Sequence, residues 1–238
     1  MSPLQWLAFD TSTEALSIGV AAKGHTDVRT LAGGAQSSAT LIPTAMEMLL
    51  QAGIGLPQLD AIVFGRGPGS FTGLRTACAV AQGLAFGADI LVLPVDTLLA
   101  VAEEARVLAG VNDQPLTVLA MLDARMDEVY SAAWDWDGQR WTLRQPLQVG
   151  GPQHVLLPDA SRVLLAGNAF EAYGERLPAG ERVQALPTAA ALLRLAPSLF
   201  ADGHAVPAEQ AMPLYIRDKV AQTTAERMAE RETAKGAP

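Results

Sequence analysis

Two short segments of the chain carry hydroxyl side chains, one of them beside an acidic residue and the other beside glycines. The first is DTST (residues 10–13), which follows a short apolar run, and the second is GRGPGSFTGLR (residues 65–75), which lies between two apolar runs. Hydroxyls and free backbone N–H groups at the start of a helix suit an anion such as phosphate. The residues that we predict for a phosphate or nucleotide contact are Asp10, Thr11, Ser12, Thr13, Gly67, Gly69 and Ser70.

Both segments also have a purely structural interpretation. The hydroxyls of residues 11–13 suit the cap of a hairpin. A tight turn at residues 68–69, with Ser70 or Thr72 as the N-cap of a helix, accounts for the glycines. The second segment is not a P-loop, because Gly73 is followed by Leu and Arg instead of Lys and then Ser or Thr.

Apolar periodicity predicts the elements that position these segments. In residues 1–109 it favours the order βββαβαβα, with strands at residues 4–9, 14–22, 27–31, 59–65 and 90–95 and helices at 38–52, 73–87 and 96–110. In residues 110–218 the same order returns, with strands at 116–122, 129–136, 140–149, 162–167 and 181–186 and helices at 151–158, 168–177 and 188–203. We expect residues 219–238 to form a frayed or disordered tail.

Two βββαβαβα halves resemble the α/β fold shared by actin, sugar kinases and Hsp70 (the ASKHA fold). In that fold the turn after the first strand of each half faces a cleft between two domains. The first such turn here is DTST, but the matching turn of the second half, DARMDE (residues 123–128), has neither glycine nor hydroxyl. One of the two phosphate contacts is therefore missing, which argues against a self-sufficient ATP site.

Composition excludes several classes of protein. The 238 residues carry a formal net charge of −8, whereas a protein that binds an RNA backbone alone has a basic patch. A single cysteine, Cys78, excludes an internal disulfide and a cysteine-based zinc cluster. The sequence has no signal peptide pattern and no apolar run long enough to span a membrane, so we expect a cytoplasmic protein.

The chain resembles the bacterial TsaB (YeaZ) family over nearly its whole length. The segments that carry the resemblance are LAFDTSTEALSIGV, LIPTAMEMLLQAG, LDAIVFGRGPGSFTGLRTACAVAQGLA, LDARMDEVY and PLYIRD. The most specific of them is GRGPGSFTGLR. TsaB proteins are paralogues of the TsaD family, which transfers a threonylcarbamoyl group to N6 of the adenosine beside the anticodon and so forms t6A in tRNA.

The resemblance implies a non-catalytic scaffold or activating subunit with no cofactor of its own. Family members pair with TsaD through their N-terminal domain, join the ATPase TsaE, and form homodimers through the same face when TsaD is absent. The expected partners are therefore a TsaD-type transferase and a TsaE-type ATPase, with tRNA reached only through the complex. ATP or ADP at the boundary of the complex is a further expectation.

The histidines test this assignment from the sequence itself. The metal site of TsaD uses two histidines four residues apart on one helix, which places both side chains on one face. Here the only histidines are His25, His154 and His204, and none is within helical reach of another. The sequence therefore predicts no metal site and no catalytic residue of the TsaD kind.

The first two predicted helices are apolar over most of their surface. At about 100° per residue the apolar positions of the first helix cover roughly 200°, about twice what packing on one sheet needs. The second helix has a stripe of small residues that permits close approach of another backbone. We predict a helix-on-helix interface with a partner through Leu41, Ala45, Met46, Met48, Leu49, Thr76, Ala79 and Gly83. Burial within the chain itself is the alternative.

Two enzymatic alternatives remain at this stage. A small-molecule ATPase or kinase of the actin-like superfamily would require a second phosphate loop in place of DARMDE. A glycoprotease-like metallopeptidase would require the missing pair of histidines.

Overall fold

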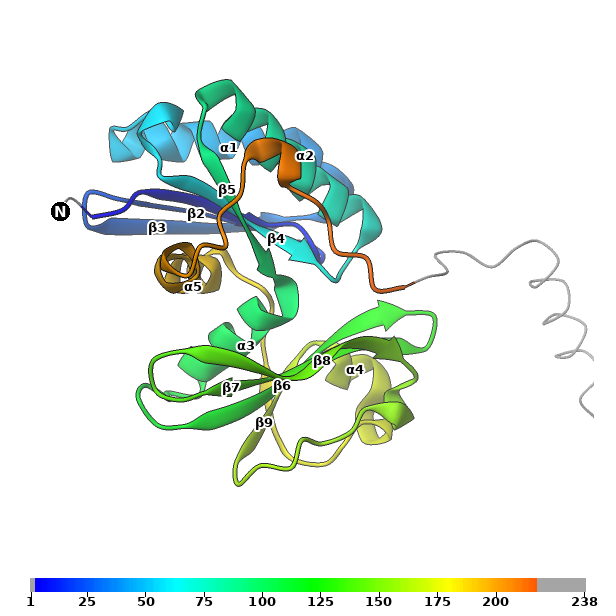
Figure 1. The fold of residues 1–238 in the computed structure, drawn as a ribbon. Helices are drawn as coiled ribbons and strands as arrows, with labels where there is room; N and C mark the ends of the chain where they lie inside the picture. Colours follow the sequence, from blue (N-terminus) through cyan, green and yellow to red (C-terminus); the bar gives the residue numbers. More distant parts are fainter. Residues whose placement is uncertain (1–2, 218–238) are drawn as a thin grey trace, which may run out of the picture.

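The computed structural model describes residues 3–217 and contains two five-stranded mixed sheets (Figure 1). The strand order is β3-β2-β1-β4-β5 in the first sheet and β8-β7-β6-β9-β10 in the second. In each sheet three consecutive strands form an antiparallel meander, and the two later strands add in parallel beside the first strand. The two halves of the chain therefore share one topology, which confirms the predicted ASKHA-type α/β fold.

The strands and helices follow the predicted order closely. The strands are β1 (Trp6–Asp10), β2 (Ala15–Ala22), β3 (His25–Ala32), β4 (Ala61–Gly67), β5 (Leu91–Asp96), β6 (Leu116–Arg125), β7 (Glu128–Trp136), β8 (Trp141–Gly150), β9 (Val163–Gly167) and β10 (Glu181–Gln184). The helices are α1 (Ser37–Ala52), α2 (Phe71–Ala88), α3 (Thr97–Leu108), α4 (Ala169–Tyr173) and α5 (Ala189–Ala201). None of the helices within residues 3–217 is both long and apolar enough to cross a membrane.

One predicted helix is wrong. Residues 151–158 contain only a single 3-10 turn, Pro152–His154, so the second half reads βββ-turn-βαβα. Prolines stand near both ends of this segment, and a residue that precedes proline is disfavoured in the helical conformation. Only the five residues 153–157 lie between the two prolines, little more than one helical turn of about 3.6 residues. The predicted tail at residues 219–238 lies outside the described residues.

The two halves exchange their last helices. Figure 1 shows α1 and α2 on one face of the first sheet and α5, from the second half, on its other face. Helix α3, from the first half, packs on β6 and β9 of the second sheet and against α5. Side chains of both sheets, α3 and α5 form one continuous core, whereas α4 packs on the far face of the second sheet. The predicted division of the chain at residue 109 remains a prediction, but apolar packing is continuous across it.

A buried carboxylate joins α3 to α5 at the centre of this shared layer. The Glu103 side chain is 3% exposed and pairs with Arg106 at 2.9 Å and with Arg194 at 2.7 Å. Its Oε2 also accepts a hydrogen bond of 3.0 Å from Trp141 Nε1 on β8. These donors hold the pKa of Glu103 below its ordinary value despite the opposing effect of burial.

Replacing Glu103 by Ala should lower the free energy of unfolding by about 3 kcal/mol, because two guanidinium groups and an indole N–H lose their shared acceptor. The matched control is Glu47→Ala, which removes an exposed pair with Arg29 and should change stability by less than about 1 kcal/mol. Urea denaturation measures both. Equal losses in the two variants would show that Glu103 does not hold α3 and α5 together.

Candidate functional site

The DTST turn and the glycine-rich segment pack directly against each other. They follow β1 and β4, which are parallel neighbours, so both segments leave the same edge of the first sheet. Ser70 N donates to Ser12 O at 2.8 Å, and Thr11 Oγ1 donates to Gly73 O at 2.6 Å. Thr11 is buried and its hydroxyl is used within the chain, as is the Ser12 hydroxyl described below.

Four glycines of this segment make close approaches that a side chain would block. A Cβ atom at Gly65 would overlap the Asp10 carboxylate, and one at Gly73 would overlap the Thr11 carbonyl oxygen. At Gly69 it would lie 2.6 Å from Ser12 Cβ, and at Gly67 it would lie 2.5 Å from the Leu214 carbonyl oxygen. The glycine pattern is thus required by packing. Ser70 precedes α2 as predicted, although its side chain makes no capping hydrogen bond.

Asp10 is buried beneath the turn. Its Oδ1 accepts hydrogen bonds from Ser12 N at 2.8 Å and Ser12 Oγ at 2.6 Å, whereas Oδ2 has no hydrogen-bond partner among residues 3–217. Burial raises the pKa of Asp10 to about 6, and the two bonds from Ser12 only partly oppose this rise. Among residues 3–217, no three His, Cys, Asp or Glu side chains gather as a metal site would require.

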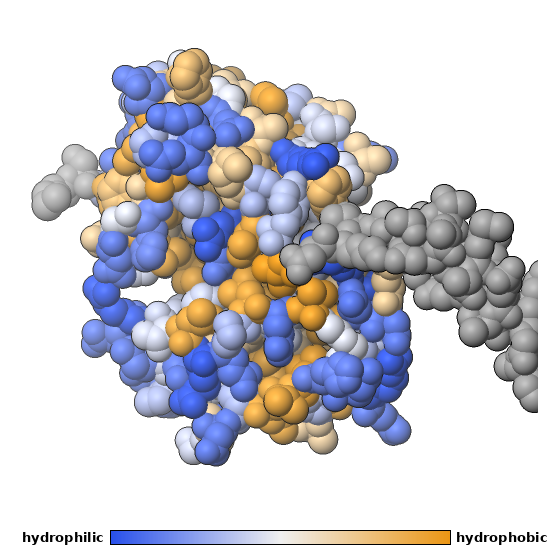
Figure 2. All heavy atoms as spheres, turned by 45° about the vertical axis from the view of Figure 1, so that its right-hand side comes forward, coloured by the Kyte–Doolittle hydropathy of each residue, from blue (hydrophilic) through white to orange (hydrophobic). Residues whose placement is uncertain are grey.

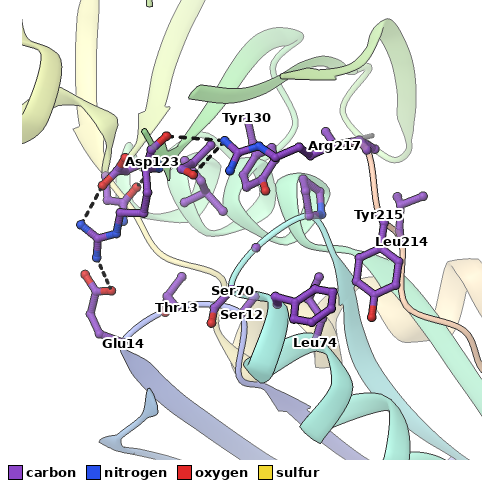
Figure 3. Close-up of a pocket in the computed structure, with 18 of the residues that line it drawn as sticks. Ser12, Thr13, Glu14, Ser70, Leu74, Asp123, Tyr130, Leu214, Tyr215 and Arg217 are labelled. Atoms are coloured by element: carbon purple, nitrogen blue, oxygen red, sulfur yellow. Dashed lines mark hydrogen bonds and ion pairs between the residues drawn. The ribbon is translucent and has the colours of Figure 1, made fainter. Parts of the chain in front are cut away.

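A cavity of about 420 Å³ lies between the two halves, and Figure 3 shows the residues around it. Of the seven residues predicted for a phosphate contact, Ser12, Thr13, Gly69 and Ser70 line the cavity. Asp10, Thr11 and Gly67 do not line it. The second half contributes Leu122, Asp123, Ala124, Arg125, Tyr130 and Asn168, and a late segment contributes Leu214, Tyr215, Ile216 and Arg217.

The β6–β7 hairpin, which carries DARMDE, forms the opposite wall. Three consecutive residues at its tip, Arg125, Met126 and Asp127, have φ near +60°, a conformation that costs energy for residues other than glycine. Arg176 pairs with Asp127, and Tyr173 donates to Asp123 Oδ1 at 2.7 Å. Burial and the carboxylate of Asp123 raise the pKa of Tyr173 to about 12. The hairpin is therefore held in a strained shape by side chains from α4 and the turn that follows it.

Residues 211–217, which we call the strap, cross from one wall to the other. Leu214 N donates to Arg66 O at 2.7 Å on the first half. At its end Arg217 donates to Ala124 O at 3.0 Å, pairs with Glu128 and lies over the Tyr130 ring. Figure 2 shows hydrophobic side chains gathered between the two halves on this side of the molecule. PLYIRD carries part of the family resemblance, but sequence reasoning missed Tyr130, Asn168 and the strap as cavity residues, because only the fold brings them there.

The predicted partner interface is only partly at the surface. Leu41, Ala45, Met48 and Leu49 are buried against the first sheet, so no partner can contact them and the prediction was wrong at these positions. Met46, Thr76, Ala79 and Gly83 are at least partly exposed. The sequence reading missed Ile42, Leu50 and Phe86, of which the last two are 78% and 79% exposed. We call Ile42, Met46, Leu50, Ala79, Gly83 and Phe86 the α1–α2 face.

Comparison with known proteins gives consistent matches over the length of the chain. The family model for TsaD, described as tRNA N6-adenosine threonylcarbamoyltransferase, matches residues 32–157. The tRNA threonylcarbamoyladenosine biosynthesis proteins TsaB of Haemophilus influenzae and Escherichia coli are 36% and 34% identical to this chain. These alignments cover 92% and 90% of this chain and 96% and 95% of the relatives. A solved structure of YeaZ from Pseudomonas aeruginosa is 38% identical in sequence, with a TM-score of 0.83 over 90% of this chain and all of that chain.

Two substitutions of glycine by alanine in α2 should have opposite effects on stability. Gly73→Ala should lower the free energy of unfolding by about 2 kcal/mol, because the new methyl group meets the Thr11 backbone. Gly83→Ala should raise it by about 0.8 kcal/mol, because no atom lies within 4 Å and alanine favours the helix. Chemical denaturation of the two variants measures both changes. A Gly73→Ala variant as stable as the wild type would contradict the packing role of this glycine.

The buried Asp10 should make the protein less stable as pH rises. The folded pKa of about 6 exceeds the ordinary value of 3.8, so the folded state holds the proton more tightly than the unfolded chain. The contribution of Asp10 to the free energy of unfolding therefore decreases as pH rises through its folded pKa, by about 1.4 kcal/mol between pH 5 and pH 7.5. Asp10→Asn should remove this component. Urea denaturation of the wild type and of Asp10→Asn at several pH values in this window measures the free energy of unfolding of both proteins. The same dependence on pH in both would refute the role of Asp10.

Proposed function

The chain belongs to the TsaB (YeaZ) family of tRNA threonylcarbamoyladenosine biosynthesis proteins, and we propose that it is the non-catalytic subunit that docks a TsaD-type transferase through its α1–α2 face. Its place in t6A biosynthesis follows from family membership. The docking role depends on one observation, the apolar α1–α2 face at the surface of the first half.

The spacing on α1 suits a partner helix. Ile42, Met46 and Leu50 recur every four residues and so form one stripe along the helix, while the rest of the apolar arc packs on the sheet. On α2, the large apolar side chain of Phe86 is 79% exposed. Exposed apolar residues gathered on adjacent helices are typical of protein interaction sites.

The α2 side of this face is lined with small residues. Ala79, Gly83 and Gly87 recur every four residues and are exposed, and no atom lies within 4 Å of a Cβ atom placed at either glycine. A glycine inside a helix costs about 1 kcal/mol relative to alanine, so two of them destabilise α2 with no benefit inside the chain. Close packing of a partner helix against these glycines offsets their cost to the stability of α2. Phe86 and Leu50 would then flank the contact.

The cleft supports a role without catalysis by this chain. The glycines that suggested a phosphate contact are occupied by packing against DTST and the strap, and Asp10 does not line the cavity. The opposite wall offers the strained DARMDE hairpin, which has no glycine or hydroxyl. These features weigh against the ATPase or kinase alternative. The three histidines lie in different elements, on β3, in the Pro152–His154 turn and after α5, which weighs against the metallopeptidase alternative.

The remaining expectations belong to this proposal. A TsaE-type ATPase joins the assembly, tRNA contacts the chain only through the complex, and the α1–α2 face forms a homodimer when the transferase is absent. ATP or ADP binds at the boundary between the subunits, with Ser12, Thr13, Gly69 and Ser70 as the hydroxyls and backbone groups nearest the open cavity. The cytoplasm, where tRNA is modified, is the expected location.

Gly83→Arg should abolish association with a TsaD-type transferase, because a long charged side chain then fills the site of closest helix approach. The variant should remain folded, since no atom of residues 3–217 outside the neighbouring backbone of α2 lies within 4 Å of a Cβ atom placed here. The control is Leu156→Arg, which places the same side chain at a 68% exposed position in the second half. Size-exclusion chromatography with the transferase measures the outcome, and co-elution of Gly83→Arg would exclude this face.

Synthesis of t6A in vitro tests the role itself. Omission of this chain from the reconstituted reaction should lower the rate at least about tenfold, and Gly83→Arg should reproduce the omission while Leu156→Arg should not. Purified chain alone should hydrolyse neither ATP nor peptides. An equal rate of t6A synthesis without the chain would remove the proposed role.

A further inference from the structure

The strap forms few backbone contacts for a segment that crosses the whole cleft. Leu214 N to Arg66 O is the single backbone hydrogen bond from residues 212–217 to the rest of residues 3–217. Met212 is 66% exposed and Tyr215 is 45% exposed, and the segment has no regular secondary structure. Segments with few backbone hydrogen bonds and high exposure open locally at a lower free energy than the whole fold.

Side chains hold the strap at its two ends. At the first end the Ala211 carbonyl oxygen accepts hydrogen bonds from Cys78 Sγ at 3.2 Å and Gln82 Nε2 at 2.9 Å, both on α2. At the other end Arg217, with its side chain 15% exposed, pairs with Glu128 and donates to Ala124 O in the second half. Arg217, which we call the latch, thus ties the end of the strap to the second half.

The strap lies along α2 beside the α1–α2 face. Tyr215 packs on Phe71 with ring centroids 5.4 Å apart, and its hydroxyl accepts a hydrogen bond of 3.1 Å from Arg75 Nε. Arg75 precedes Ala79 by four residues, and Gln82 precedes Phe86 by four residues. Residues four apart are neighbours on a helix surface, so the α2 residues that hold the strap adjoin those that we assign to docking.

From this adjacency we propose that the strap is the third element of the docking surface, with Met212 and Tyr215 in contact with the partner, so that a docked transferase holds the strap closed over the cleft. The inference rests on the proposed docking of a TsaD-type protein. Exposed apolar side chains on all three elements, Leu50 on α1, Phe86 on α2 and Met212 on the strap, support this occupant. Docking and closure of the cleft are then linked, and each must favour the other by the same factor.

The chain carries its own reporter for the position of the strap. Cys78 is the single cysteine of the chain, is 5% exposed, and donates to the strap at Ala211. A thiol reagent such as 5,5′-dithiobis(2-nitrobenzoate) therefore reacts with one site only, at a rate set by strap opening while the fold is intact. Thermal denaturation of each variant separates local opening from global unfolding.

Without a partner, Arg217→Ala should increase the rate of Cys78 modification about tenfold, because two hydrogen bonds that involve charged groups are lost. The matched control is Arg140→Ala, which breaks an exposed pair with Asp202 away from the strap and should leave the rate unchanged. Equal rates in the two variants would overturn the role of Arg217 as a latch. These rates are measured without a partner, so their outcome does not depend on the proposed function.

With a saturating amount of the TsaD-type protein from the same organism, the rate for the wild type should decrease at least about fivefold. Met212→Glu should weaken association about tenfold, whereas Leu156→Glu, at a similarly exposed position in the second half, should not. Association that leaves the Cys78 rate unchanged, or that tolerates Met212→Glu, would overturn the docking role of the strap. Absence of association for the wild type would overturn the proposed function together with this inference, while the partner-free rates would still report on the latch.

Discussion

The contact between the DTST turn and the start of α2 determines the geometry of everything around it. β1 and β4 end side by side, and the two connections that leave them interlock through Gly69, Gly73 and the hydrogen bonds from Ser70 N and Thr11 Oγ1. Because this contact fixes the first turn of α2, it also fixes the direction in which the rest of the helix presents its outward face. The same contact uses the Thr11 hydroxyl and the Ser70 N–H within the chain. One packing arrangement therefore both orients α2 and removes two polar groups of these segments from contact with a ligand.

The exchange of α3 and α5 restricts rotation of the two halves relative to each other. In a fold whose two halves carried their own helices, the halves could rotate about the connection between them. Here the core runs from the first sheet through α5 and α3 to the second sheet, and Glu103 joins the two helices inside it. Rotation of the halves would have to break this layer. Movement at the cleft is therefore more readily assigned to the strap, which is held mainly by side chains, than to a hinge between the halves.

The sequence was sufficient to predict most of the fold but less of the site. Strand and helix order follow from local periodicity, and they failed only at residues 151–158, where the prolines at 152 and 158 override the apolar pattern. The two helices that we propose for docking were predicted for the same reason, but of their outward residues only Met46, Thr76, Ala79 and Gly83 were predicted. Periodicity shows that α1 has two apolar sides and does not show which side meets the sheet, so Leu41 and Leu49 were assigned outward while Leu50 and Ile42 were missed. The strap was missed as part of the site because its contacts join residues more than 80 positions apart, such as Arg217 and Glu128, and no local pattern predicts such pairs.

Helix α2 unites the three parts of the proposal because each occupies a different side of it. Its first turn packs on DTST, its flank with Cys78 and Gln82 holds the strap, and its outer side with Ala79 and Gly83 is open. A rigid helix transmits a displacement at one side to the others, and its N-terminal end is fixed by Gly73 against backbone, where no side chain can yield. A partner on the open side therefore cannot shift α2 away from the cleft. Docking on α2 therefore acts on the cleft through the contacts that α2 makes with the strap. For this reason we expect the strap to respond to docking.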